Sequence, residues 1–114
     1  MKIGKVWGET KPWLVTPLVE IHRVSASEGG FSSKHYHEHK WNAFYVISGI
    51  LEITVFKDEY ELEDVTELGP DEMTTVKPGE WHLFRAVEDC KFLEIYYLEP
   101  LKEDIIRDGV GGSG

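Results

Sequence analysis

Four histidines in two separate stretches are the residues of this sequence best suited to hold a metal ion. His35, His37 and His39 stand at every second position just before an apolar run, and His82 follows a Pro-Gly turn far downstream. Side chains alternate between the two faces of an extended segment, so the first three histidines are expected to project to one side. Imidazole is a ligand of Zn, Mn, Fe, Ni and Co alike. The spacing therefore predicts a site for one divalent transition metal of open identity.

Short strands are the elements expected to position these histidines. Alternating apolar and polar residues between Gly and Pro turns predict strands at residues 18–25, 44–47, 50–57, 60–68, 73–76, 82–87 and 92–99. No convincing amphipathic helix interrupts them, which favours an all-β antiparallel barrel or sandwich. His22 shares a strand face with Glu20 and is therefore expected to be solvated.

The length of 114 residues suits one domain, which we divide into an N-terminal arm or edge strand at 1–17, a barrel at 18–100 and a tail at 101–114. The arm holds two prolines, which resist central strands, and two tryptophans. We expect the tryptophans to pack on the barrel or across a subunit interface, and so predict a homodimer formed through the arm. The end of the tail is expected to be disordered.

The composition limits the partners and the compartment. The formal net charge is −9, which disfavours nucleic acid and anionic membranes as partners, because both require a basic face. No apolar run approaches the about 20 residues of a membrane span, and no signal-peptide pattern opens the chain. We predict a cytoplasmic protein with a small-molecule partner. The single cysteine, Cys90, excludes an internal disulfide and is expected to be structural.

The two histidine stretches resemble the two motifs of the cupin family. The matching pattern is Gly30…His35-x-His37-x4-Asn42-x6-Gly49, followed by Gly69…Pro78-Gly79-x2-His82. The resemblance implies a double-stranded β-helix, or jelly roll, with a metal bound inside the barrel by His35, His37 and His82. In that family the fourth ligand is a glutamate, and this chain has Asn42 in its place. An amide is a weaker ligand than a carboxylate, so Asn42 is expected to coordinate loosely, to orient a ligand, or to leave a position open for water.

Among cupins, the chain is similar to the cupin domain of type II mannose-6-phosphate isomerases, a domain often fused to a mannose-1-phosphate guanylyltransferase. The distinctive matching residues are Trp7-Gly8 and the late run Glu103-Asp104-Ile105-Ile106-Arg107. The resemblance implies interconversion of an aldose and a ketose through a cis-enediol. A divalent metal would polarise the sugar oxygens, and a base would move a proton between C1 and C2.

The residues expected to carry this chemistry lie around the predicted site. His39 and Glu94 are the candidate bases, and His39 is expected to be a pocket residue rather than a ligand. Glu94 is expected to line the barrel with its alternating neighbours on the last strand. The candidate substrate-binding residues, as phosphate contacts or as side chains at the barrel mouth, are Lys40, Arg85, Arg107, Tyr45, Trp81 and Tyr96.

Two other functions remain open from the sequence. Three histidines with an open coordination position also suit an Fe(II) dioxygenase-type cupin. The absence of the family's glutamate favours a non-catalytic cupin that binds a sugar or another small molecule. A barrel that has lost its metal and keeps the histidines for packing is a further alternative. Metal content and oxygen uptake discriminate among these functions.

Overall fold

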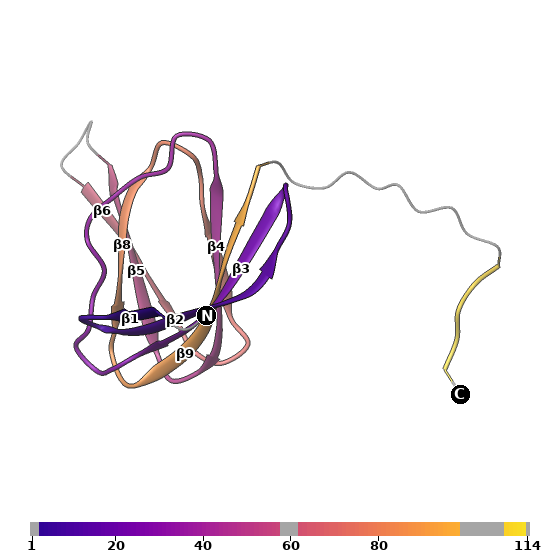
Figure 1. Ribbon diagram of the computed structural model, residues 1–114, viewed down its shortest axis with the longest axis horizontal. Coiled ribbons are helices and arrows are strands. Elements are labelled where there is room, and N and C mark those ends of the chain that lie inside the picture. The colour runs from indigo at the N-terminus through magenta and orange to yellow at the C-terminus, as the bar shows by residue number, and fades with distance from the viewer. Residues whose placement is uncertain (1–2, 58–61, 99–108, 114) are drawn as a thin grey trace.

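The computed structural model describes residues 3–57, 62–98 and 109–113, and all its regular elements in these ranges are β-strands (Figure 1). The strands are β1 (Ile3–Lys5), β2 (Gly8–Val15), β3 (Val19–Ala26), β4 (Trp41–Ser48), β5 (Leu51–Lys57), β6 (Leu62–Leu68), β7 (Met73–Val76), β8 (Trp81–Ala86) and β9 (Cys90–Tyr97). The expected strands are confirmed to within a few residues over these ranges. The part of the chain that the structure describes contains no helix able to span a membrane.

The strands form two antiparallel sheets that face each other. The larger sheet has the order β1-β2-β3-β9-β4-β7, and the smaller has the order β6-β5-β8. Strands adjacent in sequence are often in different sheets, as when β4 pairs with β9 while β5 pairs with β8. This is the jelly-roll arrangement of a double-stranded β-helix, and it confirms the expected fold class.

The apolar core fills one end of the space between the sheets. Phe44 and Phe92 come from the larger sheet and Phe84 from the smaller, and all three are buried. The rings of Phe84 and Phe92 meet edge to face with centroids 5.2 Å apart, a favourable aromatic arrangement. Cys90 also belongs to this core, and burial raises the pKa of its thiol to about 11, which fits the structural role expected for it.

The expected N-terminal arm forms β1 and β2, and β2 pairs with β3 along most of its length. β1 pairs only with Gly8 to Thr10, so the rest of β2 is the edge of the sheet. Pro12 lies in this edge segment, where a residue without an N–H removes no ladder bond, and the register shifts between Pro12 and Leu14.

Two glycines with positive φ allow tight turns, one after β4 and one before β8. Gly49 has φ +82°, and a Cβ on it would meet the carbonyl oxygen of Asp89 at 2.1 Å. Gly79 has φ +83° in the turn before β8, with open space around it. Glycine reaches this left-handed conformation without the steric cost of a side chain. The second turn delivers His82 to the inner side of β8.

Candidate metal centre

The three histidines of the candidate site come from two segments that are joined by backbone hydrogen bonds. His35 and His37 lie in the connection between β3 and β4, and His82 lies on β8. The N–H of His35 donates to the carbonyl of His82 at 3.0 Å, and the N–H of His82 donates to the carbonyl of His35 at 2.8 Å. The N–H of Gly79 donates to the carbonyl of His37 at 2.8 Å. The connection is therefore held at His35 by β8 and at His37 by the turn that precedes β8.

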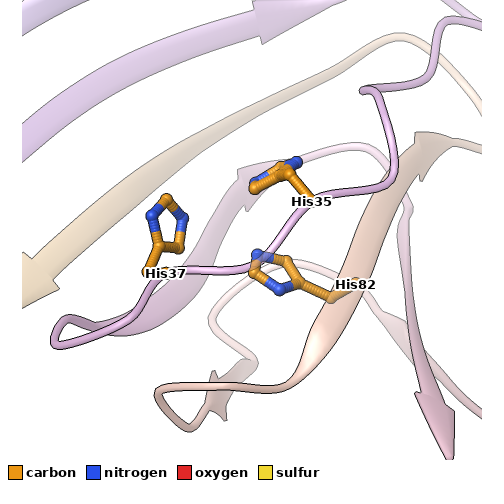
Figure 2. Close-up of side chains that lie close together, drawn as sticks. All are labelled: His35, His37 and His82. Carbon is orange, nitrogen blue, oxygen red and sulfur yellow. The ribbon is translucent and has the colours of Figure 1, made fainter. Parts of the chain in front are cut away.

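The three rings converge on one point, as Figure 2 shows. Ring centroids are 4.5 Å apart for His35 and His82, 5.1 Å for His35 and His37, and 5.5 Å for His37 and His82. One ligand nitrogen from each ring lies within 4.8 Å of the others. Two nitrogens bound to one ion at about 2.0–2.1 Å can be up to about 4 Å apart, so the cluster is close to the span of a metal site.

The hydrogen-bond pattern leaves a ring nitrogen of each histidine available to an ion. His35 Nδ1 lies 2.7 Å from the carbonyl of Ser33, and His82 Nδ1 lies 2.9 Å from the carbonyl of Glu80. A carbonyl only accepts, so each neutral ring donates from Nδ1 and presents a lone pair at Nε2. Nε2 of His37 is buried and has no hydrogen-bond partner. Such an unsatisfied nitrogen fits a bound cation.

Burial keeps two of these imidazoles neutral. It lowers the pKa of His82 to about 4, and the charges of His35 and His37 act in the same direction. The pKa of His37 is lowered chiefly by burial, then by His35 and Lys40. At neutral pH no proton competes with a metal for the lone pairs of His37 and His82.

Asn42 adds an oxygen atom beside the cluster. It lies on β4 with its side chain fully buried, and its Oδ1 is 3.3 Å from Nε2 of His82. Its Nδ2 points toward the carbonyl of Ala43, at 3.5 Å, which favours this orientation of the amide. The amide of Asn42 therefore directs its oxygen to the side where the three imidazoles meet.

Glu94 places a buried carboxyl group next to the same cluster. It lies on β9, and its side chain faces the barrel interior, as the alternation of the strand predicts. Burial raises the pKa of Glu94, while hydrogen bonds from Tyr96 and Asn42 and the charges of His35 and His22 oppose that change. Burial and the neighbouring Glu94 raise the pKa of Tyr96. The site thus pairs three imidazoles that could hold a metal ion with a carboxyl group whose pKa is raised.

A cavity of about 270 Å³ reaches this site at His35 and Glu94. Its lining includes His35, Glu94, Tyr96 and His22, together with residues of the N-terminal strands and of the connection. This volume suits a small ligand. A larger depression of about 490 Å³, lined by residues such as Ser25, Ser48 and Cys90, contains none of the cluster residues.

Several residues expected at the site lie elsewhere. The chain bends at Glu38 and His39, so strand alternation does not hold there, and the His39 side chain is 82% exposed beside Glu38. The expectation that all three early histidines share one side is therefore wrong for His39. Lys40 remains close to the site, with Nζ 5.7 Å from the centre of the Tyr96 ring.

Three further side chains expected at the barrel mouth point outward. Trp81 and Arg85 alternate with the buried His82 and Phe84 on β8, so they face solvent. Tyr45 lies between buried neighbours on β4, and its hydroxyl bonds to Asp71 outside the barrel. These placements correct the expectation that Tyr45, Trp81 and Arg85 contact a ligand in the barrel. Arg107 lies outside the described residues.

His22 is a site residue that the sequence reasoning missed. Its side chain is 21% exposed rather than solvated, and it lines the cavity opposite Glu94 on β9. His22 alternates with Val24 and Ala26, which are both buried core residues, and this parity was the signal that it faces inward.

Comparison with known proteins agrees with this architecture. The family model of the cupin domain matches residues 22–96, about two-thirds of the chain, and the chain therefore belongs to the cupin family. No protein of curated function matches the sequence.

Solved structures share the fold at low sequence identity. KdgF from Halomonas sp. is 18% identical with a TM-score of 0.72, and the match covers 84% of each chain. A double-stranded β-helix protein from Klebsiella pneumoniae is 21% identical with a TM-score of 0.71, covering 86% of this chain and 78% of that one. Oxalate decarboxylase from Bacillus subtilis, a structure with Mn(II) centres, is 17% identical with a TM-score of 0.74. That match covers 90% of this chain and 28% of the decarboxylase.

Proposed function

We propose that this cupin is a metal-dependent isomerase that moves a proton between adjacent carbons of a small hydroxy-carbonyl substrate, an aldose–ketose interconversion. The observation that carries the proposal is the buried carboxyl of Glu94 beside three imidazoles whose ring nitrogens are available to an ion. A metal site and a proton-transferring group are the two components that such a reaction requires, and the cavity is lined by one member of each, His35 and Glu94.

His35, His37 and His82 would hold the ion, with Asn42 as a weak or indirect fourth partner. A divalent cation bound there supplies Lewis acidity, which makes the hydrogen on the carbon next to a carbonyl more acidic. The ligand set is neutral, since it consists of imidazoles and an amide. Because no ligand carboxylate offsets the charge of the ion, the site favours substrate oxygens that carry or develop negative charge.

Glu94 is the group proposed to move the proton. A carboxylate whose pKa is raised by burial is a stronger base than an ordinary glutamate, and the carboxylic acid that it forms can return the proton to the substrate. Tyr96 hydrogen-bonds to Glu94 and limits the orientation of its carboxyl group. His39, the other candidate base in the sequence, is exposed and lies outside the cluster, so Glu94 is the better choice.

Mannose 6-phosphate is the first substrate to test, because the sequence resembles the cupin domain of mannose-6-phosphate isomerases. Lys40, beside the Tyr96 ring, is the cation placed to contact a phosphate. Arg85 faces away, and the net charge of −9 opposes an anion, so an unphosphorylated hexose belongs in the same substrate panel.

The test is solvent deuterium exchange at C2 of mannose 6-phosphate and mannose, followed by proton NMR with Zn, Mn, Fe, Ni or Co added. We expect exchange with one of these metals and a loss on the order of 10²-fold or more in Glu94→Gln. Glu52→Gln is the matched control, because Glu52 lies on the outer side of β5, opposite Arg85.

Absence of exchange for the whole panel at saturating metal would contradict the isomerase. Oxygen consumption by the Fe(II)-loaded protein would instead indicate a dioxygenase-type cupin. Sugar binding without turnover, in the absence of metal, would indicate a binding module. Each result assigns the cavity to a different function.

A further inference from the structure

The inner face of β3 and β9 changes from apolar to polar along the strands. Cross-strand partners share a face, and the buried pair Val24 and Phe92 belongs to the apolar core. The next two pairs on the same face, moving away from the core, are His22 with Glu94 and Glu20 with Tyr96. Polar side chains are the exception on the inner face of a sheet, so four in neighbouring positions indicate a role beyond packing.

His22 and Glu94 reach the cavity from neighbouring strands. They are direct partners in the register between β3 and β9, and both line the cavity of about 270 Å³. Directly opposed side chains of an antiparallel pair have Cβ atoms about 4.5–5.5 Å apart. Burial raises the pKa of Glu94, and the charge of His22 is one of the influences that oppose this change. A small ligand in the cavity can therefore contact an imidazole and a carboxyl group together.

Glu20 determines which nitrogen of His22 carries the proton. Nε2 of His22 lies 3.3 Å from Oε2 of Glu20, two residues away on the same face of β3. An ionised carboxylate only accepts hydrogen bonds, so the neutral ring donates from Nε2 and carries its lone pair on Nδ1. The ring of Tyr96 meets the imidazole edge to face, with centroids 6.0 Å apart. His22 therefore has one nitrogen engaged by Glu20 and a second nitrogen that can accept a proton.

The reaction proposed for the site moves two protons, and Glu94 accounts for only one of them. The carboxylate of Glu94 takes the hydrogen of C2 as a proton, the C–H electron pair forms the C1=C2 bond, and the carbonyl π pair moves to O1. The ketose has its carbonyl at C2, so the hydroxyl proton of O2 must also reach O1. This second transfer requires a group that accepts a proton and then returns it.

We propose that His22 is a second catalytic residue, which takes the hydroxyl proton from O2 of the substrate on Nδ1 and delivers it to O1, while Glu20 positions the ring. The O2–H bond breaks and an O1–H bond forms. The electron pair left on O2 then makes the new carbonyl, and the C1=C2 pair takes the proton held by Glu94 onto C1. Both side chains return to their starting states, so the step needs no co-reactant.

This inference rests on the proposed function and narrows its substrate class. Because His22 acts on a hydroxyl proton, the substrate must carry a hydroxyl group on the carbon next to its carbonyl. His22 and Glu94 then divide the two proton transfers between oxygen and carbon.

The test separates carbon exchange from ketose formation in His22→Gln. Solvent deuterium exchange at C2 requires only the transfer at carbon, whereas ketose formation requires both transfers. With mannose 6-phosphate or mannose and the added metal that supports exchange in the wild type, we expect exchange close to that of the wild type and ketose formation lower by about 100-fold or more. His39→Gln is the matched control and should change neither rate, because His39 is 82% exposed and lies outside the cluster.

The two rates distinguish failure of this inference from failure of the isomerase. Equal losses of exchange and ketose formation in His22→Gln would overturn the assignment, because a general disturbance of the cavity lowers both. Undiminished ketose formation in His22→Gln would also overturn it and would leave the isomerase intact. Absence of both reactions in the wild type would contradict the isomerase and, with it, this role of His22.

A second measurement does not depend on turnover. Long-range 1H–15N NMR of the metal-free full chain reports which nitrogen of the neutral His22 ring carries the proton, and we expect Nε2. Glu20→Gln introduces an amide that can donate or accept, so it should give a mixture of the two tautomers and lower ketose formation more than carbon exchange. A proton on Nδ1 in the wild type would overturn the proposal, and an unchanged tautomer in Glu20→Gln would overturn the positioning role of Glu20.

Discussion

Oδ1 of Asn42 lies 3.3 Å from Nε2 of His82 in the interior of the barrel. Nδ1 of His82 donates to the carbonyl of Glu80, so in the neutral ring Nε2 carries a lone pair, and the amide oxygen also carries lone pairs. Two acceptors facing each other repel unless a cation or a proton lies between them. With this amide orientation and tautomer, the pair fits a cation beside His82, in agreement with the three-histidine spacing.

The first prediction concerns the histidines themselves. Removal of one imidazole from a three-imidazole site should lower metal affinity by at least about 100-fold, because the two remaining neutral ligands hold a divalent ion weakly. His37→Ala and His82→Ala are the test variants, measured by isothermal titration with Zn or Ni. His39→Ala is the control, since His39 is 82% exposed, and its affinity should equal that of the wild type.

The strand alternation that predicted the fold also explains which site residues the sequence identified. His35, His37 and His82 were recognised because their spacing and the following turn are local features, and the backbone bonds between His35 and His82 bring the segments together. His39 was misplaced because the chain bends at residues 38–39, a tertiary feature with no signal in the spacing.

Three further residues, Trp81, Arg85 and His22, were misplaced in the prediction because strand alternation was not applied to them consistently. Once His82 faces inward, Trp81 and Arg85 on the same strand must face outward. The same parity on β3 places His22 inside with Val24, although its neighbour Glu20 suggested solvent. The register between β4 and β9 pairs Asn42 with Tyr96 and so places Glu94 diagonally from Asn42, and it depends on long-range pairing that a single sequence does not specify.

The second prediction concerns Asn42. An amide oxygen is a weak ligand, so Asn42→Ala should lower metal affinity by no more than about tenfold, much less than either histidine variant. Asn42→Asp should raise the affinity, because a carboxylate offsets the charge of the ion. Titration calorimetry on the wild type, Asn42→Ala and Asn42→Asp checks both the expected decrease and the expected increase in metal affinity. A loss in Asn42→Ala as large as in His82→Ala would instead make the amide a full ligand.

The third prediction concerns the acid sensitivity of the metal-free protein. Burial lowers the pKa of His82 from 6.5 to about 4, so the unfolded chain binds a proton at higher pH than the folded chain does. The resulting stability is present above pH 6.5 and is lost as the pH falls toward 4. The loss amounts to about 3 kcal/mol at about 1.4 kcal/mol per pH unit.

Urea unfolding of the metal-free wild type and of His82→Gln at pH 7 and pH 4.5 measures the pH-dependent contribution of His82 to the free energy of unfolding. Glu94 acts with the opposite sign, because its raised pKa gives stability that is lost as the pH increases through its folded value. Glu94 is present in both proteins, so the difference between their pH-dependent decreases in unfolding free energy gives the contribution of His82. We expect the pH 7 to pH 4.5 decrease in unfolding free energy to be smaller in the variant, and equal decreases would contradict the prediction.

The fourth prediction compares two turn glycines with nearly the same φ. Gly49→Ala should destabilise the fold more than Gly79→Ala, because its Cβ would meet the Asp89 carbonyl oxygen at 2.1 Å, while Gly79 has open space around it. Gly79→Ala should cost only about 1–2 kcal/mol, from the left-handed conformation. Thermal and urea unfolding provide the comparison, and equal losses would show that the close approach is relieved by backbone movement.

The most direct test of the metal site is an anomalous difference map from a crystal of the Zn-loaded protein. The arrangement of His35, His37 and His82 predicts one peak per chain, about 2.0–2.1 Å from a ring nitrogen of each of the three. A peak bound by His39 and Glu38, or no peak at full Zn saturation, would contradict the site described here.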